Sequence, residues 1–185
     1  MTNAYRNGTY VAFHGGDTTN PTASSIRFYN TLKMWKANGN IDFTFVDSHD
    51  KTSPVRDSSL QATRQARLAE RLRNSKHMLL IIDQTTRNDT DNVLFEIDYA
   101  MNTCKIPIIG CYPEFTWVLD PKKLRHLWPD PLRAGIDAGT ARMIHIPFAL
   151  PAISDALSQF HVNNPPKHAL EYYNEVTYRR WGIIK

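Results

Sequence analysis

Short apolar runs alternate along this chain with longer segments of helical periodicity. The first two runs are rich in β-branched and aromatic residues, and the second alternates apolar with polar positions, as an edge strand does. Three later runs are continuously apolar, which is typical of parallel strands buried on both faces. The predicted strands are residues 9–13, 41–46, 77–82, 106–111 and 141–147, and the predicted helices are 22–37, 58–74, 91–104 and 149–160.

This repeated alternation predicts an α/β fold with one open parallel sheet and helices on both faces, because each crossover helix must cover the sheet. We expect the flavodoxin-like strand order 2-1-3-4-5. Residues 112–139 are rich in proline and glycine and are expected to be irregular, with a short helix near 124–128. The prolines at 165 and 166 favour a domain over 1–161 and a C-terminal extension over 162–185.

The composition limits the classes of function. The chain has 185 residues, a hydrophobic content of 42% and a net charge of +4, as expected for a globular domain that tolerates anions without requiring nucleic acid. No apolar run is long enough to cross a membrane, and residues 1–8 lack a signal-peptide core, so we expect a cytoplasmic protein. Cys104 and Cys111 favour a reducing compartment, and no spacing of Cys and His indicates zinc.

The helix predicted from Asp91 or Asn92 carries the most informative polar residue. Glu96 lies on the flank of its apolar stripe, where a carboxylate is expected to be half-buried at the rim of the packed helix. Such an acid is either paired or kept for chemistry, although a flanking Glu with its head in water is the commoner case. The stripe itself consists of Val93, Ile97, Ala100, Met101 and Cys104.

In a sheet of this topology, ligands bind beyond the carboxyl ends of the strands. The loops after the first three predicted strands therefore converge there, and the start of the Glu96 helix faces the same edge. An aromatic ring can stack on a base, and backbone N–H groups at a glycine turn suit a phosphate. We predict Glu96 as the catalytic residue and the following as substrate-binding residues: Phe13, His14, Gly15, Asp47, Asp83 and Asn92.

Several well-known sites are absent from the sequence. It contains no GxGxxG, no GxxxxGK[ST] and no GxSxG motif, and Phe13-His14 stands where a receiver domain would carry acids. A metal site built from His14, Asp17, Asp47 and His49 is conceivable, but such loop residues are usually turn formers, and we predict no metal. A carboxylate that stabilises an oxocarbenium-like sugar fits the remaining groups better, which favours glycosidic chemistry.

Two further patterns leave their alternatives open. Arg64, Arg67 and Arg71 share one helical face, which is either a solvated surface or a nucleic-acid contact, and the mild net charge favours the former. The tail, residues 167–185, is rich in Tyr and Arg and includes Trp181. It could be an interface with a partner, or a helix that packs back on its own domain.

The segment 10–14, the buried strand 77–82 and, above all, Val-Leu-Phe-Glu-Ile-Asp-Tyr-Ala at 93–100 followed by Lys-Ile-Pro-Ile-Ile-Gly at 105–110 resemble the bacterial TIR-like family. More narrowly, they resemble the TIR-like subunits of Thoeris anti-phage defence systems. The resemblance covers about residues 8–160 and implies a flavodoxin-like fold. It also implies hydrolase-type cleavage of NAD, with Glu96 in the position of the family's catalytic Glu.

The resemblance further implies that NAD is the substrate and that no cofactor is needed. The product would be nicotinamide and an ADP-ribose-derived signal, cyclic in the form we favour, which activates a separate effector protein. A phage-derived activator and a homo-oligomer are consistent with such a system. The sequence departs from the family at the Trp–Cys pair that often precedes the Glu, because Leu94-Phe95 stands there.

Two other functions remain open. A non-catalytic TIR-like interaction module would use residues 47–57 and the tail for partner contacts and keep Glu96 for structure. A nucleoside deoxyribosyltransferase-like enzyme would use the same kind of sheet with a helix carboxylate as nucleophile, and it ranks last because the surroundings of Glu96 look more like the TIR-like family.

Overall fold

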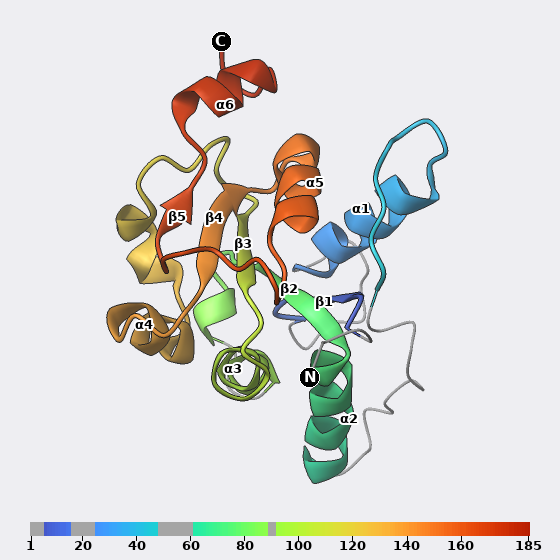
Figure 1. Ribbon diagram of the computed structural model, residues 1–185, viewed down its shortest axis with the longest axis vertical. Coiled ribbons are helices and arrows are strands. Elements are labelled where there is room, and N and C mark those ends of the chain that lie inside the picture. Colours follow the sequence, from blue (N-terminus) through green and yellow to red (C-terminus); the bar gives the residue numbers. More distant parts are fainter. Residues whose placement is uncertain (1–5, 16–24, 48–60, 89–91) are drawn as a thin grey trace.

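A five-stranded parallel sheet forms the centre of the protein (Figure 1). The computed structural model describes residues 6–15, 25–47, 61–88 and 92–185. The α/β fold and the parallel sheet are confirmed. The strands lie in the order β1-β2-β3-β4-β5 and span Gly8–Ala12, Ser75–Ile81, Ile108–Tyr112, Met143–Pro147 and Glu171–Tyr172.

The predicted strands at 9–13, 77–82, 106–111 and 141–147 lie in the predicted order, as β1, β2, β3 and β4, but residues 41–46, predicted as the edge strand beside β1, form no strand. This segment does lie beside β1, as expected of the second strand: the Thr9 N–H donates to the Val46 carbonyl at 2.6 Å, and Thr9 and Asp47 form one parallel bridge. Phe43 and Phe45 are buried between exposed neighbours, so the predicted alternation is present. A single bridge is too little pairing for a ladder, and the fifth strand comes instead from the C-terminal tail.

Helices pack on both faces of the sheet (Figure 1). One core cluster joins Leu72, Ile97 and Leu132 of α2, α3 and α4 to the strands, and a second joins Leu32 of α1 and Ile153 of α5 to the opposite face. The helices span Ile26–Ala37 (α1), Gln61–Arg73 (α2), Asn92–Asp98 (α3), Asp130–Asp137 (α4), Leu150–Gln159 (α5) and Glu175–Arg180 (α6), and shorter helical turns span Thr86–Asn88 (η2), Tyr99–Cys104 (η3) and Pro121–Leu127 (η4).

The helix that carries Glu96 forms as its apolar stripe predicts. α3 continues directly into η3, a π-helix, whose wider turn keeps the stripe on the sheet. The helix ends at Lys105, which adopts a left-handed conformation with φ of 53° and donates its N–H to the Ala100 carbonyl. The stripe is confirmed as core, since all its members are at most 5% exposed: Val93, Ile97, Ala100, Met101 and Cys104.

The segment after β3 is more ordered than predicted. η4 covers the short helix expected near 124–128, but α4 was missed because Pro131 and Gly135 are ordinarily helix breakers. Pro131 is the second residue of α4, where its missing N–H costs no hydrogen bond. Gly135 lets α4 approach η3 closely, since a Cβ there would lie 2.7 Å from the Met101 sulfur.

The tail packs back on its own domain. β5 pairs with β4, and Tyr178 of α6 is fully buried and donates its hydroxyl to the Val118 carbonyl at 3.3 Å. The Tyr173 and Trp181 rings contact each other edge-on at 4.9 Å and pack against the second core cluster. The boundary at residue 161 stays a prediction, but the residues after it contribute to both the sheet and the core.

Candidate functional site

Glu96 is a buried acid held by a buried tyrosine. It lies in α3 with 7% of its surface exposed, so the expectation of an ordinary flanking Glu in water is wrong. Its Oε1 accepts a hydrogen bond of 2.7 Å from the hydroxyl of Tyr10 in β1. Tyr10 is fully buried in the core cluster beneath α2 and α3. A carboxylate in such surroundings requires partners, and the Tyr10 hydroxyl fixes the direction in which it points.

Several charges act on the Tyr10 hydroxyl. Burial raises its pKa well above the ordinary value of 10.0, and the charge and hydrogen bond of Glu96 raise it further. Asp47 adds to this effect, whereas the positive charge of Arg71 opposes it. Tyr10 therefore stays protonated and donates to Glu96 at neutral pH. Arg71 is only 7% exposed, so the arginine face of α2 is not a uniformly solvated surface.

Asp83 follows β2 and anchors a tight polar turn. Its Oδ1 accepts from the Thr85 N–H at 2.8 Å, the Thr85 hydroxyl at 2.6 Å and the Thr86 N–H at 3.2 Å. Its Oδ2 accepts from the hydroxyl of Ser25, which precedes α1. Burial would raise the pKa of Asp83, but these hydrogen bonds outweigh it and lower the pKa below the ordinary value of 3.8. Asp83 is thus a carboxylate that ties the β2 loop to α1.

Phe13 and Asp47 meet at Tyr29 of α1. The Phe13 and Tyr29 rings stack with their centroids 5.2 Å apart, and the Tyr29 hydroxyl donates to Asp47 Oδ2 at 2.6 Å. Asp47 is 2% exposed and lies beside Thr9 of β1, and Tyr29 links it to Phe13, which follows the carboxyl end of that strand. The role of Asp47 in binding stays a prediction.

The remaining predicted residues lie where the loops meet the sheet. His14 and Gly15 follow β1 directly and are half-buried, as is Asn92 at the first position of α3. Phe13, His14, Gly15 and Asp83 thus follow the carboxyl ends of β1 and β2, as predicted. Their roles in binding stay predictions. Glu96 is bonded to Tyr10, which belongs to the first core cluster. Val11 and Ile81 belong to the second cluster, on the opposite face of the sheet.

A second buried network surrounds another strand tyrosine. Trp128 Nε1 donates to the Tyr112 hydroxyl at 2.9 Å, and this hydroxyl lies 2.7 Å from His145 Nδ1. His145 Nε2 lies 2.9 Å from the Ala169 carbonyl, which can only accept. The proton of His145 is therefore on Nε2, and Nδ1 accepts from Tyr112. Burial lowers the pKa of His145 to about 4, so the network is neutral at physiological pH.

Neither a metal centre nor a membrane span is found in the described part of the chain. Among residues 6–15, 25–47, 61–88 and 92–185, no three His, Cys, Asp or Glu side chains gather closely enough to hold a metal ion. The metal site considered above includes Asp17 and His49, which lie outside the described residues. Over the same ranges, every helix is too short or too polar to traverse a bilayer.

Sequence reasoning missed several polar residues of this region. The sequence pattern marks Tyr10 only as a residue of a predicted strand, and Arg71 only as part of a basic face. Ser25 and Tyr29 were not identified, because hydrogen bonds between distant segments leave no local pattern. The threonines at 85 and 86 were detectable, since an Asp followed closely by Thr residues is a common turn motif.

The family comparison supports the resemblance inferred from the sequence. A family model described as Thoeris protein ThsB, TIR-like domain, matches residues 10–116. The matched range begins at Tyr10 within β1, includes β2, α3 and β3, and therefore contains both Glu96 and its hydrogen-bond donor. It covers more than half of the chain, and the chain thus belongs to the TIR-like domain family of the Thoeris protein ThsB.

Proposed function

We propose that this protein cleaves the N-glycosidic bond of NAD, with Glu96 as the catalytic carboxylate. The observation that carries the proposal is a buried acid, 7% exposed, that a buried tyrosine hydroxyl holds at 2.7 Å. Burying a carboxylate is costly, and acids kept in such positions are frequent at catalytic sites. Membership of a TIR-like defence family supports the same chemistry.

In this reaction the bond between ribose C1′ and the nicotinamide nitrogen breaks, and its electron pair leaves with nicotinamide. The sugar acquires oxocarbenium character, which a nearby carboxylate stabilises. Tyr10 donates to one oxygen of Glu96 and so orients the carboxylate for this role. Water that attacks C1′ and loses a proton gives ADP-ribose, whereas attack by an adenine nitrogen gives a cyclic product. NAD is the substrate, and no resident cofactor takes part.

Phe13, His14, Gly15 and Asn92 are the proposed substrate contacts with accessible surface, since all four are half-buried. Asp47 and Asp83 already accept hydrogen bonds from Tyr29 and from Ser25, Thr85 and Thr86. We therefore assign these two acids to holding the loops around the substrate.

The proposed product is a diffusible nucleotide that activates a separate effector protein. Membership of a Thoeris family supports this role, since the resemblance implies a system of more than one protein. A phage-derived activator and self-association are the proposed sources of control, and neither nucleic acid nor a membrane is a proposed partner.

Product analysis tests the activity. The purified protein is incubated with NAD, and nicotinamide and ADP-ribose species are resolved by chromatography with mass detection. We expect nicotinamide release by the wild type and none by Glu96→Gln, and the mass of the second product separates hydrolysis from cyclisation. Glu70→Gln, an exposed acid on α2, is the matched control and should keep full activity. The assay is repeated with filtered extract of phage-infected cells.

A non-catalytic interaction module is the second candidate. The observation that favours it is the burial of Glu96 against Tyr10, which a purely structural pair would also explain. Trp117 and Val176, which are 47% and 74% exposed, offer apolar contact surface for a partner. Full activity of Glu96→Gln in a phage-protection assay, with loss of protection in Trp117→Ala or Val176→Ser, would establish this function instead.

A further inference from the structure

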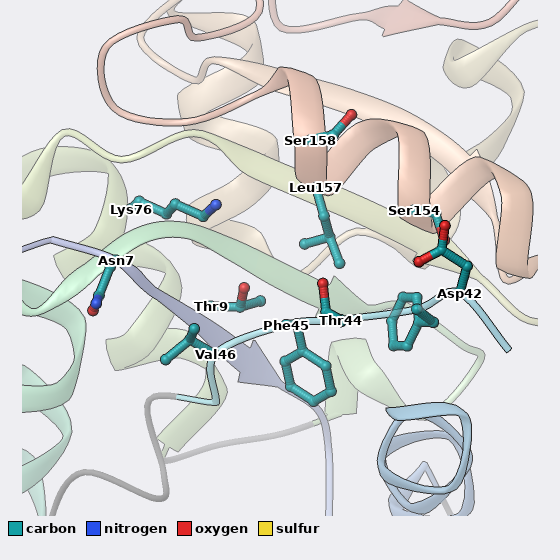
Figure 2. Close-up of a pocket in the computed structure, with 11 residues that line it drawn as sticks. Asn7, Thr9, Asp42, Thr44, Phe45, Val46, Lys76, Ser154, Leu157 and Ser158 are labelled. Atoms are coloured by element: carbon teal, nitrogen blue, oxygen red, sulfur yellow. The ribbon is translucent and has the colours of Figure 1, made fainter. Parts of the chain in front are cut away.

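A cavity of about 440 Å³ opens at the amino end of the sheet (Figure 2). Residues before and within β1, the start of β2, the segment beside β1 and the second half of α5 form its walls. Its size is within the range of small-molecule sites, and it lies away from the carboxyl edge where the predicted NAD contacts gather. Its lining comprises Asn7, Thr9, Asp42, Phe43, Thr44, Phe45, Val46, Lys76, Ser154, Leu157 and Ser158.

Thr9 lines this cavity, and its hydroxyl already donates a hydrogen bond to His77. His77 Nδ1 lies 2.6 Å from the Phe160 carbonyl, which can only accept, so Nδ1 carries the hydrogen. Burial lowers the pKa of His77 to about 3, so its Nε2 is unprotonated at neutral pH. This nitrogen lies 2.8 Å from Thr9 Oγ1 and accepts its proton. The hydroxyl of Thr9, a residue that is 1% exposed, therefore supplies no proton to an occupant of the cavity.

The hydroxyl of Ser158, on the α5 side of the cavity, also has its proton in a hydrogen bond within the protein. It donates to the Asp155 carbonyl at 2.8 Å, one turn back along α5. The carboxylate of Asp42 likewise can only accept hydrogen bonds. The hydroxyls of Thr9 and Ser158 thus supply no proton to an occupant, and Asp42 can only accept one. A donor on a ligand is satisfied at Asp42 or Ser158, and the ammonium of Lys76 is the group of the lining that suits an anion.

The charges of the lining are separated. In Figure 2 the ammonium of Lys76 and the carboxylate of Asp42 extend from opposite sides, with Thr9, Thr44 and Leu157 between them. Phe43, Phe45 and Leu157 are buried and supply apolar surface, whereas Asp42 and Ser158 are exposed at the mouth. The cavity is therefore positive at one end, negative at the other and apolar between them.

We propose that this cavity binds a short zwitterion with an apolar middle, namely a dipeptide with free termini. The ammonium group lies against Asp42, the carboxylate against Lys76 and an apolar side chain against Leu157 and Phe45. The amide N–H supplies a donor for the hydroxyl oxygen of Ser158. This binding is independent of NAD cleavage, because Glu96 contributes nothing to the lining.

Calorimetric titration of the full chain with three probes tests the site. The probes are alanyl-leucine with free termini, its N-acetyl derivative and its C-terminal amide. Each derivative removes one terminal charge, so we expect both to bind at least about tenfold more weakly than the free dipeptide. Asp42→Asn should bind the free and acetylated forms equally, and Lys76→Met should bind the free and amidated forms equally.

Asp120→Asn and Lys123→Met, exposed residues of a weak surface pair, are the matched controls and should leave all three affinities unchanged. Glu96→Gln should also bind the dipeptide as the wild type does, so failure of NAD cleavage and failure of this site are distinguishable. The proposal is overturned if the free dipeptide gives no saturable heat up to about 10 mM, or if the three probes bind with equal affinity.

Discussion

Two strand tyrosines, Tyr10 and Tyr112, are fully buried and each donates a hydrogen bond to a titratable group. Tyr112 belongs to a neutral chain of contacts that runs from Trp128 through His145 to the Ala169 carbonyl. Tyr10 donates instead to a carboxylate, within the fields of Asp47 and Arg71. Both networks lie in the first core cluster and have a tyrosine at their centre, but only the Tyr10 network contains an acid.

This difference indicates that the Tyr112 network stabilises the core, whereas the Tyr10 network holds an acid that is suited to chemistry. In the Tyr112 network every donor has an acceptor and no charge is buried, which rigidifies a core at little cost. In the Tyr10 network the fold accepts the cost of a buried acid on a helix that the apolar stripe alone would hold in place. A structure that needs only packing gains nothing from Glu96, so its presence favours function.

The largest expected effect comes from the acid. Glu96→Gln keeps the side-chain shape and an oxygen that accepts from Tyr10, but it removes the charge that we propose stabilises the sugar cation. We expect at least about 100-fold slower NAD cleavage, in line with the loss of one electrostatic or acid–base catalyst. Nicotinamide release measured beside far-UV circular dichroism checks this. If Glu96→Gln is inactive because it is unfolded, then Glu96 is needed for the fold, and the contrast between a stabilising Tyr112 network and a functional Tyr10 network fails.

The neutral network predicts a dependence of stability on pH. His145 has its pKa lowered from 6.5 to about 4, because burial disfavours the charged ring. Between these values the unfolded chain binds more protons than the folded one, so the free energy of unfolding falls as the pH decreases. The loss for His145 is about 3 kcal/mol by pH 4, and it levels off below that.

Urea unfolding followed between pH 7.5 and pH 4 measures this slope. His145→Gln should flatten it, whereas His126→Gln, an exposed histidine, should leave it as in the wild type. An equal slope in His145→Gln and the wild type would mean that the buried imidazole does not control it. His77, whose pKa is lowered to about 3 by burial, adds to the slope over a similar range.

Removing the hydroxyl of Tyr112 should cost stability but not activity. In Tyr112→Phe the Trp128 N–H and His145 Nδ1 both lose a partner in the core. Two unsatisfied buried groups cost about 2–4 kcal/mol, which lowers the melting temperature of a chain of this size by roughly 5–10 °C. Calorimetry measures the shift, and NAD cleavage per folded molecule at 20 °C should stay at the wild-type rate.

The smallest effect is expected for Tyr10→Phe. The ring remains in the core, but Glu96 loses a donor that orients it. We expect NAD cleavage to fall about tenfold, which corresponds to about 1.4 kcal/mol and lies at the lower end of what one hydrogen bond to a charged group is worth. Tyr172→Phe, at an exposed tyrosine, is the control. If Tyr10→Phe and Tyr112→Phe affect the rate and the melting temperature equally, the two networks do not differ in function.

Local patterns of apolar and polar residues were sufficient to predict most of the fold. The continuous apolar run of β2 and the stripe from Val93 to Cys104 were sufficient to place a buried strand and the Glu96 helix, because burial on both faces or on one stripe dictates residue spacing. The β1 and β3 segments were found in the same way. Sequence also selected Glu96, although it predicted a more exposed side chain.

What sequence could not provide depends on contacts between distant segments. The bond from Tyr10 to Glu96 joins residues 86 positions apart, and no periodicity encodes it. The sequence did not indicate β5, because this strand pairs over only two residues, too few to produce an alternating pattern. α4 was missed because the value of Pro131 and Gly135 depends on their position within the helix and on Met101 beside it.

The ring nitrogens of His77 and His145 each face a backbone carbonyl near the C-terminal part of the chain, at Phe160 and Ala169. Buried, hydrogen-bonded ring protons exchange slowly with solvent, so both should give separate proton resonances in an NMR spectrum recorded in water. Each resonance would report whether its part of the chain is docked on the sheet. A ligand or partner that loosens the tail would be detected as the loss of the His145 signal while that of His77 persists.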